Sequence, residues 1–255
     1  MDKREIDDAV IEFAAAQERG EYFPQAWAGR LLLDDAYRIQ LALLRRRDAG
    51  ARRIGWKVGL TAAAIQQQFG VHEPVFGCLL ADGLRRSGEV FSHAALIRPG
   101  FENELCIVLG RDLPPDATPT QVAAAIDRVY PAFEIIETRG DFTGELALAL
   151  ADNAQQKAFV LGEPVAADRL PDLAAVEVRV RINDTAVATA AGEAVLGHPC
   201  NAVAWLAAKL TAFGETVRAG DYIMSGSFTR QFALGPGDRI AADFAGIGSV
   251  SASFV

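Results

Sequence analysis

The chain has 255 residues, of which 51% are hydrophobic and 23% charged, which indicates a globular protein with one large domain or two unequal ones. Its formal net charge of −8 argues against a nucleic-acid partner, because binding a polyphosphate needs a basic surface. The acidic N-terminus is unlike a signal peptide and no run of about 18 apolar residues occurs, so we expect a cytoplasmic protein without a membrane span. Cys78, Cys106 and Cys200 lie in apolar stretches without a CxxC spacing, which favours buried free thiols.

The region 1–80 is predicted to be mainly helical. Ile6, Val10 and Phe13 recur at helical spacing, and Thr61 is typical of a helix N-cap. Later helices are predicted to begin at Thr118 and at Pro199. The predicted helix ends are, in chain order, Gly50, Gly70, Pro131 and Gly214.

The region 81–255 is predicted to be rich in strands. Branched and alternating residues favour strands at 101–110, at 133–136 and at 176–182, and Asn183-Asp184 suits a hairpin turn. The C-terminal tail also reads as strands, which are separated by glycine-rich turns. Because regular helices do not alternate with these strands, a doubly wound fold is excluded, and an α+β chain with a β-rich sandwich or rolled-sheet body is expected.

Two glutamates in the first of these strands form the sharpest chemical signal. Glu102 and Glu104 are spaced i and i+2, so their side chains leave the same face of a strand. Neighbouring carboxylates repel each other, and a divalent cation such as Mg²⁺ or Mn²⁺ removes that repulsion. A strand end that emerges into water is the alternative explanation for this common spacing.

Glu134 and Lys57 also lie among apolar residues. Glu134 lies between Phe133 and Ile135, where a carboxylate usually has a partner, although an exposed edge strand would also accommodate it. Lys57 follows Trp56 in a stretch without other charges, so it could bind a carboxylate or transfer a proton. Alternatively, its stem packs on Trp56 while its ammonium reaches water.

Three further polar positions have weaker signals. Asp82 ends an apolar run and fits either a turn residue or a general base. His198 precedes a helix, where a structural donor is the commoner role, and Ser225 ends a strand where hydroxyl and N–H groups could hold an anion. Nucleotide-binding glycine loops and the GxSxG elbow of serine hydrolases do not occur.

Taken together in order, the motifs of the chain resemble those of one enzyme family. The segments are GWKVGLT, FGCLLAD, RPGFENELCIVLGRDLP, YPAFEIIETR, LADNA, AVLGHPCNAVAWLA, AGDYIMSGS and PGDRIAADFAGIGSVSASF. They are similar to the 2-keto-4-pentenoate hydratase and 4-oxalocrotonate decarboxylase family, a branch of the fumarylacetoacetate hydrolase superfamily. The resemblance covers roughly residues 30–255, and it is specific as a set although each motif alone is weak.

The resemblance implies a fold, a metal site and a set of catalytic residues. It implies a helical N-terminal region and a rolled-sandwich catalytic domain of fumarylacetoacetate hydrolase type. The residues that it implies are Glu102, Glu104 and Glu134 as ligands of Mg²⁺ or Mn²⁺, Lys57 and Asp82 as catalytic residues, and Lys57, Gln155 and Ser225 as substrate-binding residues. It also implies a homo-oligomer, with association between related hydratases and decarboxylases as a further possibility.

The expected substrate is a small 2-oxo acid, and the expected reaction is hydration of a short 2-hydroxy-2,4-dienoate to a 4-hydroxy-2-oxo acid, as in the meta-cleavage catabolism of aromatic compounds. Val58 after the lysine resembles hydratases. Gln155 replaces a serine that is frequent in relatives, and a larger amide at a position that lines the pocket would change the substrate tail that fits. Decarboxylation of 4-oxalocrotonate is the alternative. A hydrolase that cleaves a carbon–carbon bond and a non-catalytic partner subunit stay open as further alternatives.

Overall fold

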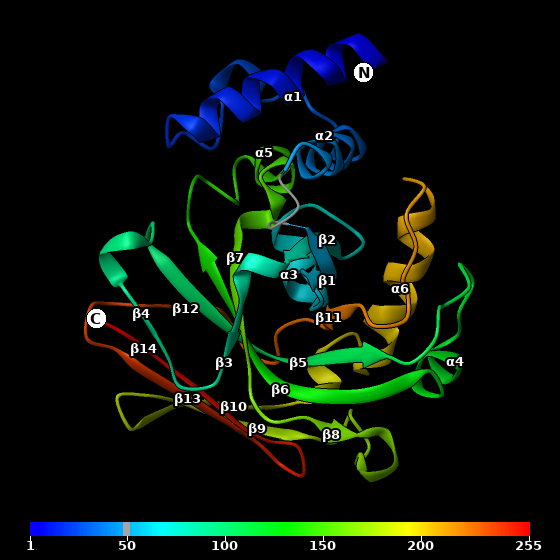
Figure 1. Cartoon of the computed structure of the whole chain (residues 1–255), viewed down its shortest axis with the longest axis vertical. Helices are drawn as coiled ribbons and strands as arrows, with labels where there is room; N and C mark the ends of the chain where they lie inside the picture. The colour runs from blue at the N-terminus through cyan, green and yellow to red at the C-terminus, as the bar shows by residue number, and fades with distance from the viewer. Residues whose placement is uncertain (48–51) are drawn as a thin grey trace.

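A computed structural model describes residues 1–47 and 52–255 (Figure 1). The predicted helix stop at Gly50 lies outside these residues. Helices α1 (Lys3–Glu18) and α2 (Leu33–Arg45) form a layer above the strands, and the short helix α5 (Leu146–Ala151) packs beside α2. The predicted apolar face of α1 is confirmed, since its buried residues are Ile6, Ala9, Val10, Phe13 and Ala16.

A nine-stranded mixed sheet forms most of the body. Its main path runs in the order β2-β1-β11-β5-β6-β7-β3, with β12 paired to β5 and β8 paired to β6. The bounds are β1 Arg53–Gly59, β2 Val75–Leu80, β3 Leu84–Arg86, β5 Pro99–Leu109, β6 Ile126–Glu137, β7 Gln156–Leu161, β8 Val165–Ala166, β11 Tyr222–Met224 and β12 Phe232–Ala233. Because β1 and β2 belong to this sheet, the sheet begins at Arg53 and the expected boundary at residue 80 falls inside it.

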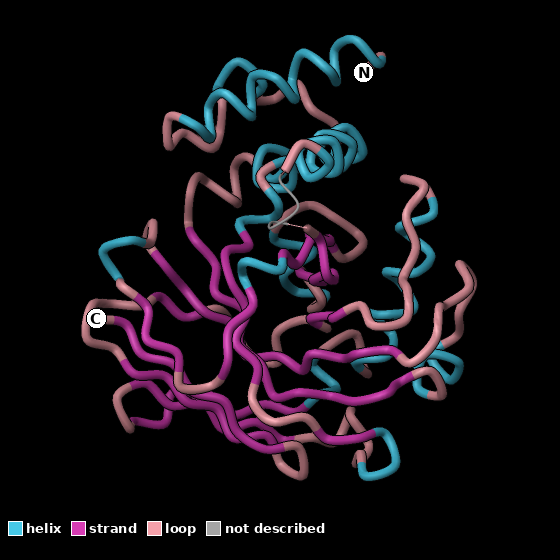
Figure 2. The backbone as a smooth tube through the Cα atoms, viewed as in Figure 1, coloured by secondary structure: helices cyan, strands magenta, loops and turns pink. Residues whose placement is uncertain are grey.

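A second, five-stranded sheet has the order β10-β9-β13-β14-β4. It consists of β4 Glu89–Phe91, β9 Glu177–Ile182, β10 Thr185–Ala191, β13 Arg239–Phe244 and β14 Gly248–Phe254. β14 contacts β6 and β7, so the two sheets stack as the two strand layers in the lower half of Figure 2. The predicted hairpin between β9 and β10 is confirmed, with Asn183 and Asp184 at φ 51° and 67°, the left-handed values of a tight turn.

The other α-helices of the described residues are α3 Ala63–Gln68, α4 Pro119–Ala123 and α6 Pro199–Thr211, and α6 contacts α4 and β1. Thr118 caps α4 as predicted, but α4 ends at Ala123 and Pro131 lies inside β6, so the predicted helix end at Pro131 is wrong. Thr61 is also not the N-cap of α3, because Ala62 occupies that position. His198 caps α6 by accepting a hydrogen bond from the Cys200 N–H, at 3.0 Å, on Nδ1.

The two faces of β5 and β6 have different surroundings. Phe101, Leu105 and Phe133 on one face join the main apolar core, together with Val250 and Ala252 of the second sheet. The other face carries the three glutamates beside a small apolar cluster that consists of Leu79, Cys106, Ala132, Phe159, Leu161 and Met224. The polar site therefore lies on the face of the large sheet that is turned away from the second sheet.

The cysteines and the lengths of the helices bear on two expectations from the sequence. The three cysteines are buried and free, as predicted. Within residues 1–47 and 52–255, no helix combines the length and the apolar character that crossing a bilayer requires.

Candidate metal centre and cavity

Three carboxylates from two adjacent strands converge on one face of the large sheet. Glu102 of β5 lies directly opposite Glu134 of β6, and Glu104 lies two residues further along β5. One carboxylate oxygen from each residue lies within 4.8 Å of the other two. This convergence follows from strand alternation and antiparallel register, which place residues that are far apart in the sequence side by side.

Several oxygens of these carboxylates are buried without a hydrogen-bond partner. Glu104 and Glu134 are fully buried and Glu102 is partly buried. Glu104 Oε2 accepts a hydrogen bond from the Gly226 N–H at 2.8 Å, whereas Glu104 Oε1 and both oxygens of Glu134 have no hydrogen-bond partner among the described residues. Buried unpaired carboxylate oxygens are costly, and oxygen ligands with a charge of −3 fit a divalent cation. The donor set therefore fits a Mg²⁺ or Mn²⁺ ion.

Lys57 supplies a positive charge beside the carboxylates. Its side chain is 6% exposed, and its Nζ lies 3.4 Å from Glu134 Oε1. Lys57 pairs with Met224 of β11, and Met224 pairs with Cys106 of β5, so the lysine shares the face that carries Glu104. β11 therefore lies between the strand of the lysine and the strand of the two glutamates.

Burial and mutual charge shift the ionisation of this group. Burial raises the pKa of Glu102, and it raises the pKa of Glu134 to about 7 although Lys57 opposes that shift. Burial, followed by the charges of Glu134 and Glu102, raises the pKa of Glu104 well above its ordinary value. Burial alone lowers the pKa of Lys57, but the three glutamates outweigh it and the net shift is upward. Lys57 is therefore held as an ammonium ion.

A cavity of about 660 Å³ opens onto Lys57 and Glu102. Its walls combine apolar side chains, among them Phe69, Val75 and Ile136, with polar groups. The polar and charged residues along the cavity are Lys57, Thr61, Arg98, Glu102, Thr138, Asp141, Thr143, Gln155, Ser227, Thr229, Arg230 and Gln231. This combination suits a small, charged ligand with an apolar chain.

The structure separates the remaining predicted residues. Gln155 lines the cavity, and its Nε2 donates to the Gly140 carbonyl at 3.2 Å. Ser225 is fully buried and its hydroxyl has no described partner, whereas Ser227, two residues later in the same motif, lines the cavity. The predicted residue, Ser225, therefore lies two positions before Ser227, the serine that lines the cavity.

Asp82, which the family resemblance implies as a catalytic residue, does not line this cavity. Its exposed side chain lies in a turn after β2 and lines a different cavity, with Glu137 and Arg139. Lys57 pairs with Gly77 inside β2, whereas Asp82 lies in the turn that follows the end of β2 at Leu80. Lys57 and Asp82 therefore line different cavities of this chain.

Comparisons with known proteins identify the family of the chain. The fumarylacetoacetate (FAA) hydrolase C-terminal family model matches residues 61–255. The chain belongs to this family. It is 40% identical over 225 residues to a 2-keto-4-pentenoate hydratase of Paraburkholderia xenovorans (strain LB400), an alignment that covers 87% of this chain and 84% of the relative. It is 38% identical over 224 residues to a 4-oxalocrotonate decarboxylase of Pseudomonas putida, with 87% and 85% covered.

A solved structure extends the similarity to the N-terminal helices. The 4-oxalocrotonate decarboxylase from Pseudomonas putida G7, complexed with magnesium and adipate, matches with a TM-score of 0.92 and 32% identity over 100% of this chain and 99% of that chain. The predicted α+β architecture, with N-terminal helices before a rolled β-rich body, is thus confirmed, as is membership of the branch of hydratases and decarboxylases.

Proposed function

We propose that the chain is a metal-dependent lyase that hydrates a short 2-hydroxy-2,4-dienoate to a 4-hydroxy-2-oxo acid. The observation that carries the proposal is the convergence of three carboxylates, two of them fully buried, and one buried ammonium group beside a partly apolar cavity. Hydratases among the relatives of this chain support the same reaction. In this proposal Mg²⁺ or Mn²⁺ is held by Glu102, Glu104 and Glu134.

When bound, the cation would supply Lewis-acid polarisation of the substrate C2 oxygen. The protein itself supplies a proton donor, because Lys57 is kept charged and its Nζ lies beside Glu134 Oε1. We assign to Lys57 the proton transfer to the end of the conjugated chain, and the recovery of that proton from the enol hydroxyl. Water then adds at C4, with its oxygen on C4 and a proton on C3, so that one water molecule is consumed.

The residues around the cavity hold the substrate for this chemistry. Ser227 and Thr229 offer hydroxyl groups, and Gln155 limits the space for the substrate tail. The apolar side chains of Phe69 and Val75 exclude bulk water from part of the wall. A chain of about five carbons fits this arrangement if its carboxylate points toward the cation that the glutamates would hold and its apolar end lies near Lys57 and along this wall.

Ultraviolet absorbance tests the proposal. With Mg²⁺ or Mn²⁺ added, the chain should remove the conjugated absorbance band of 2-hydroxypenta-2,4-dienoate, and Glu104→Gln should abolish this turnover. Glu163→Gln, which changes an exposed loop carboxylate, is the matched control and should retain full activity. Wild-type activity in Glu104→Gln, or in protein treated with EDTA, would rule out the metal mechanism.

Decarboxylation of a 2-oxo-enedioic acid is the second candidate, and a specific feature of the cavity favours it. Arg98 and Arg230 line the same cavity as Lys57, so they offer positive charge to a second carboxylate. The solved decarboxylase that matches over the full chain was complexed with adipate, which is a dicarboxylic acid. Carbon dioxide release from 4-oxalocrotonate would support this candidate, and loss of the dienoate band without carbon dioxide would support hydration.

A further inference from the structure

One wall of the cavity is built from a strained turn. Asn153, Ala154 and Gln155 all have left-handed backbone conformations, with φ of 57°, 48° and 60°. Left-handed conformations cost free energy for residues other than glycine, and three in succession persist only where surrounding contacts impose them. Ala154 and Gln155 line the cavity, so the strained turn belongs to the ligand-binding surface.

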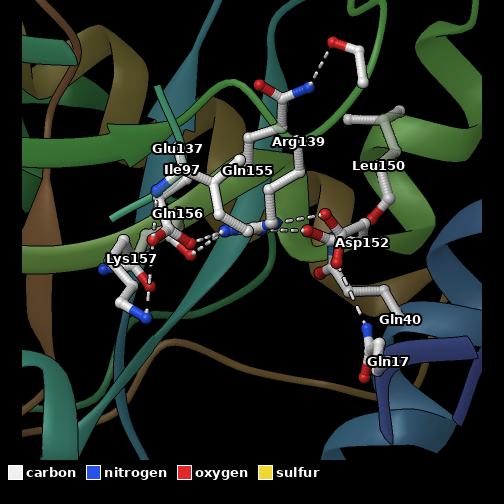
Figure 3. Close-up of polar contacts among 11 residues, drawn as sticks. Gln17, Gln40, Ile97, Glu137, Arg139, Leu150, Asp152, Gln155, Gln156 and Lys157 are labelled. Atoms are coloured by element: carbon white, nitrogen blue, oxygen red, sulfur yellow. Dashed lines mark hydrogen bonds and ion pairs between the residues drawn. The ribbon is translucent and has the colours of Figure 1, made fainter. Parts of the chain in front are cut away.

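A buried arginine contacts the chain on both sides of this turn. Arg139 Nε donates to Asp152 Oδ2 at 2.6 Å and Nη2 donates to the Asp152 carbonyl at 2.9 Å, immediately before the turn. Arg139 Nη1 lies 3.4 Å from the Gln156 carbonyl, immediately after the turn. Figure 3 shows the guanidinium group between Asp152 on one side and Glu137 on the other.

The same arginine is fixed to the strand that carries a predicted metal ligand. Its Nη1 donates to Glu137 Oε2 at 3.1 Å, and Glu137 is the last residue of β6, three positions after Glu134. The side chains of Arg139, Glu137 and Asp152 are only 5%, 3% and 3% exposed. Asp152 Oδ1 also accepts from Gln17 Nε2 at 3.1 Å, which ties helix α1 to the network (Figure 3). A buried guanidinium with this many partners has a single well-defined position.

The left-handed turn also contacts β2, the strand that pairs with the strand of Lys57. The Asn153 side chain accepts from the Cys78 N–H at 2.7 Å and donates to the Cys78 carbonyl at 2.9 Å, as a neighbouring strand would. Gly77, which pairs with Lys57, lies between Asn153 and the lysine stem. A Cβ atom at Gly77 would lie 3.2 Å from the Asn153 carbonyl oxygen and 3.3 Å from Lys57 Cγ. Gly77 therefore packs closely between the turn and the lysine stem, and a methyl group would fit there only if one of the two moved by a few tenths of an ångström.

The far end of the turn holds another part of the cavity wall. Gln155 Nε2 donates to the Gly140 carbonyl at 3.2 Å. Gly140, together with the following residues 141–143, lines the cavity. A displacement of the turn would therefore be transmitted both to the Lys57 stem and to this loop.

We propose that Arg139 is a positioning residue: it holds the left-handed turn Asn153–Gln155 in the shape that forms the cavity wall and supports the Lys57 stem. Arg139 itself touches no reacting atom in this proposal. Its role is to offset the strain of the turn through Asp152, Glu137 and the Gln156 carbonyl, and so to fix the distance between the lysine and the substrate. The kinetic part of the test rests on the proposed function, whereas the structural part does not.

The test uses the full-length variants Arg139→Lys and Asp152→Asn. Lysine keeps the charge of Arg139 but cannot reach both sides of the turn, and Asp152→Asn keeps the acceptor oxygen but removes its charge. We expect amide hydrogen exchange over residues 152–157 to quicken about 10-fold or more, and acetylation of Lys57, followed by mass spectrometry, to quicken as well. The dissociation constant for Mn²⁺ should change by less than about 3-fold, because the three glutamates lie on β5 and β6.

Kinetics provide the second readout. We expect kcat of Arg139→Lys to fall roughly 10- to 100-fold, since a misplacement of about 1 Å at a reacting group costs about this much. Asp152→Asn should fall in the same direction by a smaller factor, and it keeps the test decisive if Arg139→Lys does not fold. Arg181→Met is the matched control, because it removes an arginine–aspartate pair from the second sheet and should leave every readout unchanged.

Two outcomes would overturn the proposal. A folded Arg139→Lys or Asp152→Asn protein with wild-type exchange over residues 152–157 and wild-type acetylation of Lys57 would show that the turn does not depend on Arg139. Wild-type kcat with quickened exchange would show that the turn does not position Lys57. If the wild-type chain itself turns over no dienoate, the proposed function fails, while exchange and acetylation still decide the role of Arg139.

Discussion

Glu104→Gln should make the metal-free protein more stable while it abolishes metal binding. The three carboxylates have oxygens within 4.8 Å of one another, and two unit charges at that distance repel by roughly 3 kcal/mol at an effective dielectric constant of about 20. Partial protonation relieves part of this repulsion, so we expect a gain of about 1–3 kcal/mol in the free energy of unfolding. A glutamine oxygen can still accept the Gly226 N–H, so the backbone contact is preserved.

The magnitude predicts a measurable shift in melting temperature. For a chain of this size, about 1 kcal/mol corresponds to roughly 2–4 °C, so a gain of about 1–3 kcal/mol should make Glu104→Gln melt roughly 2–12 °C above wild type in EDTA. Mg²⁺ at about 100 times its dissociation constant raises the free energy of unfolding of wild type, but not of Glu104→Gln, by about 2.7 kcal/mol. In Mg²⁺ the melting temperature of wild type should therefore equal or exceed that of Glu104→Gln. Differential scanning calorimetry in EDTA and in Mg²⁺ measures both values, with Glu163→Gln as the exposed control.

The pH dependence of this gain follows from the direction of the pKa shift. Burial raises the pKa of Glu104 above its ordinary value of 4.5, so the glutamate contributes least to stability when pH lies above its folded pKa. The advantage of Glu104→Gln should therefore be larger at pH 8 than at pH 5. A lower melting temperature than wild type in EDTA at pH 8, together with no response of wild type to Mg²⁺, would refute the repulsion argument.

Three further predictions concern the same site. Because the pKa of Glu134 is raised to about 7, affinity for Mn²⁺ should increase as pH rises from 6 to 8 and binding should release protons, which titration calorimetry in buffers of different ionisation enthalpy measures; an affinity independent of pH in this range would contradict it. Gly226→Ala should lower the free energy of unfolding by about 2–4 kcal/mol in urea, because φ is 114° and the new Cβ would lie 2.5 Å from Thr61 Cγ2; a variant as stable as wild type would exclude this clash. Gly77→Ala should reduce kcat about 10-fold with a smaller change in stability, because the new methyl group presses on the Lys57 stem; unchanged kcat would show that the stem has room to move.

The sequence predicted the parts of the site that depend on local spacing. Glu102 and Glu104 share a face because strands alternate, and this holds for any strand whatever its neighbours. The meeting of Glu102 with Glu134 depends on the register of β5 against β6, which no local pattern specifies, and it was expected only from the resemblance to a family. Lys57 reaches the carboxylates across β11, a strand that lies more than 160 positions later in the chain.

The wrong prediction of a helix end at Pro131 has a physical cause too. Pro131 was expected to end a helix because proline lacks an N–H. It lies inside β6 instead, where its carbonyl accepts a hydrogen bond from the Gly162 N–H at 2.9 Å and no N–H of its own is needed. The catalytic role of Asp82 was implied only by the resemblance to a family, and the turn after β2 places its side chain at another cavity of this chain. The network around Arg139 could not be predicted, because its contacts join residues 17, 137, 139, 152 and 156 only after folding.

The central place of β11 has a consequence for how the molecule is made. This strand is synthesised after residue 220, yet it separates β1 from β5 in the finished sheet. A nascent chain on the ribosome therefore carries two open sheet edges, on β1 and on β5, until its last tenth or so emerges. Truncations that remove the C-terminal strands should yield aggregating protein rather than a smaller enzyme, and chaperones that shield strand edges should raise the yield of expression.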